Sequence, residues 1–141
     1  MTELLRVGGV ARLDPEGERE IRLWREELGR GEIDEPEATR ARLEAHERGD
    51  AVVVRLDLFA DVLAPDGGIE RHDGARVVGL WFYAGRRTEN IEHAREMVVD
   101  NLDRLAADLA EAGFPVDASM VENVPIRVEV EERLERELGE R

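Results

Sequence analysis

The chain has 141 residues, no cysteine and a formal net charge of −14, from 34 acidic and 20 basic residues. The length suits one domain, which we place at residues 1–130, followed by a helical tail at 131–141. The lack of cysteine excludes disulfide bonds, thiolate catalysis and cysteine-ligated metals. The sequence has neither an apolar run of about 18 residues nor the pattern of a signal peptide, so we expect a cytoplasmic protein with no membrane partner.

The acidic residues are concentrated in the segments that we expect to be helical. Residues 14–50, 88–112 and 129–141 carry most of them, whereas the middle of the chain is nearly neutral, and every basic residue is arginine. A negatively charged helical layer repels phosphate backbones, so we expect no nucleic-acid partner. A basic protein partner remains open.

The first third of the chain predicts one strand and two helices. Apolar and basic residues alternate loosely over residues 4–13, which indicates a strand, and the Gly8-Gly9 pair within it is typical of a bulge. Asp14 and Pro15 then begin a helix with an apolar stripe that ends at Gly29. A second helix follows over residues 34–49, where Asp34 and Glu37 have the spacing of a capping box.

The middle of the chain predicts two strands. Residues 51–63 alternate between apolar and polar side chains, as in a half-buried strand. Turn signals fill residues 65–74, around a short piece that could extend the hairpin. Residues 76–84 are apolar on both faces, which predicts a central strand of the sheet covered on both sides.

A long amphipathic segment at residues 88–112 predicts a single helix that crosses the sheet. Apolar side chains recur at steps of three and four residues on one face. Thr88 suits the N-cap, and Gly113 suits the left-handed position after the last turn. At 1.5 Å per residue, this helix is a rod of roughly 37 Å.

Residues 116–130 contain strand-like alternation, which is clearest at Ile126, Val128 and Val130. Because Pro125 cannot donate a ladder hydrogen bond, we expect this strand at an edge of the sheet or broken at Pro125. The tail predicts a weak helix. The element order β-αα-ββ-α-β matches an α+β fold of the ferredoxin-like plan, with a two-layer antiparallel four-stranded sheet, helices on one face and a short C-terminal helix. An alternative places residues 1–50 in a separate helical arm.

The sharpest local feature for binding is Arg86, Arg87 and Thr88, between the apolar strand and the long helix. Free N–H groups and the positive end of the helix dipole favour an anion there, and two guanidinium groups could clamp a phosphate or carboxylate. The competing interpretation is an ordinary helix cap at Thr88, with arginines that are solvated or pair with nearby acids.

Other chemistry has little support in the sequence. His93 follows Glu89 by four residues, but no third ligand stands at a recognisable spacing, so we predict no metal. Ser119 is the single serine and lies in no nucleophile motif. We therefore predict no catalytic residue and no cofactor, and favour a protein that is not an enzyme.

Two functions of different classes remain. The first is a non-enzymatic interaction or regulatory module, a homodimer packed through its sheets with Trp81, Phe82 and Tyr83 at the interface. The second is a binder of a small anionic ligand at the N-terminus of the long helix, with or without catalysis.

Overall fold

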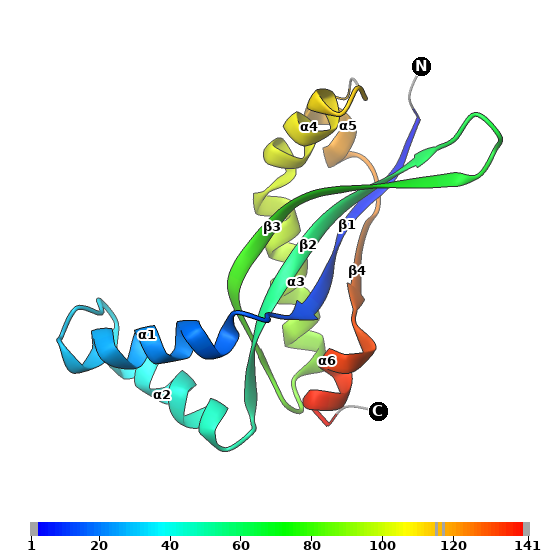
Figure 1. The fold of residues 1–141 in the computed structure, drawn as a ribbon. Coiled ribbons are helices and arrows are strands. Elements are labelled where there is room, and N and C mark those ends of the chain that lie inside the picture. The colour runs from blue at the N-terminus through cyan, green and yellow to red at the C-terminus, as the bar shows by residue number, and fades with distance from the viewer. Residues whose placement is uncertain (1–2, 115, 117, 140–141) are drawn as a thin grey trace.

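The computed structural model describes residues 3–114, 116 and 118–139. The described chain is α+β, with one mixed four-stranded sheet, a helical layer behind it and a helical arm that projects from one end (Figure 1). The elements, in chain order, are β1 (Leu4–Leu13), α1 (Gly17–Gly29), α2 (Pro36–Glu47), β2 (Ala51–Leu63), β3 (Ile69–Tyr83), α3 (Arg87–Asp100), α4 (Leu102–Glu111), α5 (Ala118–Glu122), β4 (Ile126–Val130) and α6 (Glu132–Glu137).

The strand order is β3-β2-β1-β4. β1 pairs with β2 antiparallel and with β4 parallel, and β2 pairs with β3 antiparallel. The predicted α+β class with one four-stranded sheet is confirmed, but α5 was not predicted and lies in the stretch expected to alternate like a strand. The prediction of a wholly antiparallel, ferredoxin-like sheet is wrong.

The difference between the predicted and the observed strand arrangement arises from the helical connection between β1 and β2. In the predicted plan, the helices after β1 cross the sheet, but α1 and α2 instead form an arm that turns the chain back beside β1 (Figure 1). β1, β2 and β3 therefore form an antiparallel meander. α3 and α4 do cross the sheet, so the chain returns parallel to β1 as β4.

One large hydrophobic core lies between the sheet and the layer of α3, α4, α5 and α6. Alternate side chains of β2, including Val54, Leu56 and Leu58, face this core, and Phe82 joins them from β3. The C-terminal helix is held here through Leu134 and Leu138, which are both buried. The weak terminal helix of the sequence analysis is therefore packed into the core.

A smaller hydrophobic cluster joins the arm to the sheet. Ile21 of α1 and Leu43 of α2 are buried with Val53 of β2 and Trp81 of β3. Because adjacent residues of a strand point to opposite faces, Val53 and Trp81 lie on the face opposite to Val54 and Phe82. The prediction of helices on one face is thus incomplete, and the alternative of a helical arm is correct for α1 and α2 but not for β1.

The apolar strand of residues 76–84 is the end of β3, which runs from Ile69 and lies at an edge of the sheet. The prediction of a central strand is wrong. At Phe82 and Trp81 the two faces are covered by the main core and by the arm, respectively, whereas Val78 is 58% exposed. Coverage of the two faces says nothing about pairing in the plane of the sheet.

Asn101 divides the predicted long helix in two. α3 ends at Asp100 and α4 begins at Leu102. The Asn101 side chain donates from Nδ2 to the carbonyl oxygen of Met97, 2.7 Å away, while its own main-chain N–H bonds to the carbonyl of Val98. A side chain that takes over a carbonyl of the helical ladder interrupts the helix.

The predicted helix ends differ in outcome. Gly113 has φ +96°, and the N–H of Phe114 bonds to the Leu109 carbonyl oxygen at 2.8 Å, which confirms the glycine stop. α3 begins at Arg87, so Thr88 is not its N-cap, and α2 begins at Pro36 without a capping hydrogen bond from a side chain. The capping box predicted for α2 is therefore wrong.

Candidate functional site

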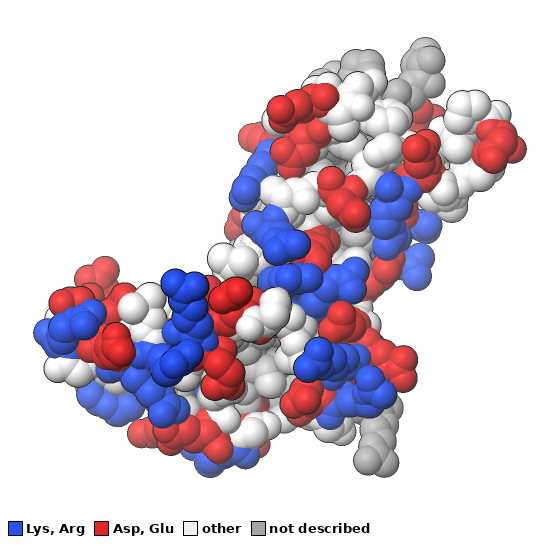
Figure 2. Space-filling model, in the orientation of Figure 1, with Lys and Arg blue, Asp and Glu red and all other residues white. Residues whose placement is uncertain are grey.

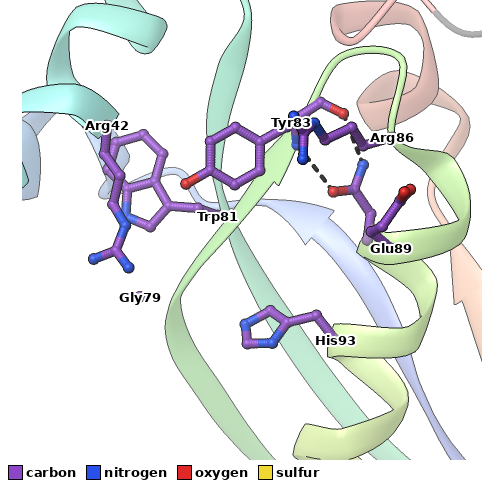
Figure 3. A pocket seen from close by; sticks show the side chains of 8 residues that line it. Arg42, Gly79, Trp81, Tyr83, Arg86, Glu89 and His93 are labelled. Carbon is purple, nitrogen blue, oxygen red and sulfur yellow. Dashed lines mark hydrogen bonds between the residues drawn. The ribbon is translucent and has the colours of Figure 1, made fainter. Parts of the chain in front are cut away.

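A groove of about 350 Å³ lies along the outer edge of β3, where the arm and α3 approach each other. Three of its residues, Gly79, Trp81 and Tyr83, alternate along β3 (Figure 3). The other walls come from α2, from the loop after β3 and from the first turns of α3. They comprise Arg42, Arg86, Glu89, Asn90 and His93.

Aromatic contacts with the arm fix Trp81, which forms the floor of the groove. Its ring lies 5.6 Å from that of Trp24, centroid to centroid, and 6.2 Å from that of His46, in an edge-on arrangement. Trp81 is 9% exposed. The His46 Nδ1 atom lies 3.0 Å from the carbonyl oxygen of Ala51, which ties the ring to the start of β2.

Asn90 fixes the end of β3 against α3. Its Oδ1 accepts from the Tyr83 main-chain N–H at 3.0 Å, and its Nδ2 donates to the Tyr83 carbonyl oxygen at 2.9 Å (Figure 3). The buried amide thus occupies the place that a neighbouring strand would take. It satisfies one residue of an otherwise unpaired edge.

The charges in the groove differ from those of the chain as a whole. The lining includes two arginines, Arg42 and Arg86, and a single acid, Glu89, while His93 lies one helical turn further along α3. Among the described residues, no ion pair involves Arg42 or Arg86. In a chain of net charge −14, this groove is therefore a local cationic site.

The structure separates the three residues that the sequence analysis grouped as an anion site. Arg86 lines the groove, whereas Arg87 donates from Nη1 to the Glu135 carboxylate of α6 at 2.6 Å. Thr88 is exposed in the first turn of α3 and does not line the cavity. The ligand-binding role of the three stays a prediction.

The three aromatic residues predicted for a dimer interface also lie in different surroundings. Phe82 is 1% exposed in the main core, Trp81 lies under the arm, and Tyr83 lines the groove. A sheet-packed homodimer stays a prediction, but the folded chain does not present Phe82 as its anchor.

The sequence analysis missed Arg42. It lies 44 positions before Arg86, on a helix whose contact with β3 depends on the arm folding back over Val53 and Trp81. No local spacing connects these two arginines. Only the apolar stripe of the arm, which includes Ile21 and Trp24, indicates that α1 and α2 pack onto a partner.

The open face of the sheet carries a mixture of arginines and acids, which intermingle between the arm and the β2–β3 hairpin (Figure 2). Here Asp61 accepts hydrogen bonds from Arg6 and Arg71, and Arg71 also reaches Glu129. The strand registers place six polar residues on this one face, namely Arg6, Arg12, Arg55, Asp57, Arg127 and Glu129. Because the charges pair with one another, we prefer the groove as the binding site.

Comparison of the chain with models of protein families, with curated proteins and with solved structures finds no significant match. In the part of the chain that the structure describes, no helix has both the length and the apolar character needed to cross a bilayer. The same part holds no cluster of three or more histidines and acids placed to bind a metal ion.

Proposed function

We propose that this protein is a non-enzymatic binding module that holds an anionic group, a carboxylate or phosphate, in the groove along β3. The observation that carries the proposal is the convergence of Arg42 and Arg86, from distant parts of the chain, on one cavity floored by Trp81 and Tyr83. The proposal joins the two functions that the sequence left open.

The chemistry of the groove supports an oxyanion as the bound group. Guanidinium groups donate in a planar fork that matches carboxylate and phosphate oxygens, and no carboxylate of the described chain forms an ion pair with these two. The aromatic floor offers an apolar surface for the rest of the ligand. Glu89 sets a limit on charge, since it repels a ligand with several negative groups.

A thermal-shift series with sodium phosphate, compared with sodium chloride at equal ionic strength, tests the proposal. We expect phosphate to raise the melting temperature of the wild type, because a ligand that binds only the folded state stabilises it. A hydrogen bond to a charged group contributes about 1.5–3 kcal/mol, so Arg42→Ala or Arg86→Ala should weaken binding roughly tenfold or more.

Arg40→Ala is the matched control. Arg40 lies on the same helix, α2, and does not line the cavity, so its replacement removes one positive charge without changing the groove. This variant should retain the phosphate effect. An equal phosphate shift in Arg40→Ala and in the double variant of Arg42 and Arg86 would refute the proposed site.

A further inference from the structure

The edge of β3 presents an unpaired main-chain position inside the groove. β2 pairs with the inner edge of β3, and no described strand pairs with its outer edge. The N–H of Ala84 points inward, to the Asp50 carbonyl oxygen, whereas the N–H and carbonyl of Tyr83 point outward, to Asn90. The main-chain N–H and C=O groups of successive residues thus point alternately toward β2 and away from it.

The alternation fixes the direction of the Trp81 main chain. Residues of an antiparallel strand direct their N–H and C=O groups alternately toward and away from the partner strand. Trp81 is two residues before Tyr83, with no register shift between them, so its N–H and C=O also point outward. No hydrogen bond to either group is found among the described residues.

The space in front of this edge is elongated. Beyond Trp81, a second cavity of about 320 Å³ continues the groove between the arm and β3, and the two cavities share Arg42, Gly79 and Trp81. Apart from these three residues, its lining includes the apolar side chains of Trp24 and Ile33 and the carboxylates of Glu27 and Glu32. The first cavity follows the unpaired strand edge from Gly79 to Tyr83 and the second continues along the arm, so together they suit an extended chain rather than a compact ligand.

We infer that the groove binds an extended peptide segment of a partner protein, which pairs with β3 at Trp81 and places one carboxylate side chain between Arg42 and Arg86. The inference rests on the proposed function, since the carboxylate is the anionic group proposed above. Hydrogen bonds to the Trp81 main chain supply the new interaction, and the two arginines select the acidic residue.

The limits of the paired stretch also follow from the structure. At one end Asn90 already occupies the edge of Tyr83, and at the other the register shift between β2 and β3 at Gly79, with φ +79°, ends regular pairing. The partner segment is therefore short. Because the whole chain carries −14, the segment is otherwise uncharged, since a polyacidic one would be repelled.

The test uses the acetylated, amidated peptide Ac-Thr-Val-Asp-Val-Thr-NH₂, its Asn analogue and sodium acetate. Amide hydrogen exchange of the intact protein is followed by NMR at saturating concentrations of each. We expect the Asp peptide to slow exchange of the Trp81 amide more than tenfold and acetate to leave it unchanged. The Phe82 amide, which points toward β2, is the internal control.

Two N-methylated forms of the Asp peptide provide a second readout. In one form every second amide is methylated, and in the other, of opposite phase, the remaining amides are methylated instead. Only one phase removes the amides that face β3, so we expect one form to lose at least tenfold in affinity and the other to keep it. Equal affinity of the two forms, or a Trp81 amide that does not respond to the Asp peptide, would overturn strand pairing.

The two failures can be told apart. If acetate and the Asp peptide bind with the same affinity, and both depend on Arg42 and Arg86, the peptide inference fails while the proposed function stands. If neither the Asp peptide, acetate nor phosphate binds, both fail. An Asn peptide that binds as well as the Asp peptide would also overturn the inference, because the arginines would then select nothing.

Discussion

Replacing Asp61 with asparagine is expected to lower the free energy of unfolding by about 3 kcal/mol, at the lower end of the range for a broken buried ion pair. Asp61 is fully buried on β2. It accepts from Arg6 Nε at 2.6 Å and from Arg71 Nε at 2.8 Å. The neutral amide leaves two guanidinium groups without their common anion, and the lower end applies because both arginines are partly exposed.

Asp50→Asn is the control for this substitution. Asp50 pairs with Arg48 at 3.1 Å, but both side chains are more than half exposed, so the loss should be below about 1 kcal/mol. Both variants remove one negative charge from a chain of net charge −14, so both relieve its self-repulsion equally. This effect therefore cancels when the two variants are compared. Urea unfolding at neutral pH measures both, and equal stabilities of the two variants would contradict the account.

The pH dependence of the same comparison follows from the pKa of Asp61. Burial opposes ionisation of this carboxyl, but hydrogen bonds from Arg71 and Arg6 outweigh it, so the pKa lies below its ordinary value of 3.8. A lowered pKa in the folded state contributes stability above the ordinary value, which is lost as the pH falls through the folded value. The difference in unfolding free energy between wild type and Asp61→Asn should therefore be constant above about pH 5. It should decrease as the pH falls below about 4.

Replacing Gly8 with alanine is expected to cost roughly 3 kcal/mol or more, as severe overpacking does. Gly8 lies on β1 between β2 and β4. A Cβ atom there would lie 1.9 Å from the carbonyl oxygen of Arg127 and 2.8 Å from Cζ of Phe59. The first of these is a backbone atom that can yield only if β4 moves away from β1, and α6 follows β4 directly.

Gly29→Ala is the matched control, because a Cβ at Gly29, the last residue of α1, meets nothing within 4 Å and its φ is not positive. This change should be neutral or stabilise by up to about 1 kcal/mol. Thermal unfolding of both variants provides the measurement. A Gly8→Ala protein as stable as wild type would show that β4 does not approach β1 this closely.

Periodicity and turn chemistry predicted the individual elements well. β1 and β2 occupy the predicted residues 4–13 and 51–63, and β4 lies where the alternation within residues 116–130 is clearest. Their signals are local, since alternation of side chains is a property of the strand itself. The glycine stop at Gly113 was equally readable, because only the backbone of the last turn decides it.

The arrangement of the elements depended on contacts that no local pattern encodes. The apolar character of Trp81 and Phe82 on opposite faces predicted a central strand, whereas the arm covers one face of an edge strand. The continuous apolar stripe predicted one helix, which Asn101 interrupts through a side-chain hydrogen bond. Of the two arginines in the candidate site, Arg86 was predicted from the sequence. Arg42 was not, because only the packing of the arm onto β3 brings it to the groove.

A two-dimensional NMR titration of the isotope-labelled protein with sodium phosphate, at constant ionic strength, shows whether an anion binds in the groove along β3. We expect the Trp81 indole and the main-chain signals of Arg42, Tyr83 and Arg86 to shift together and saturate, because these groups surround one cavity. Saturating shifts centred instead on Arg6 and Arg71 of the open sheet face, or no saturable shift in the groove, would contradict the proposed site.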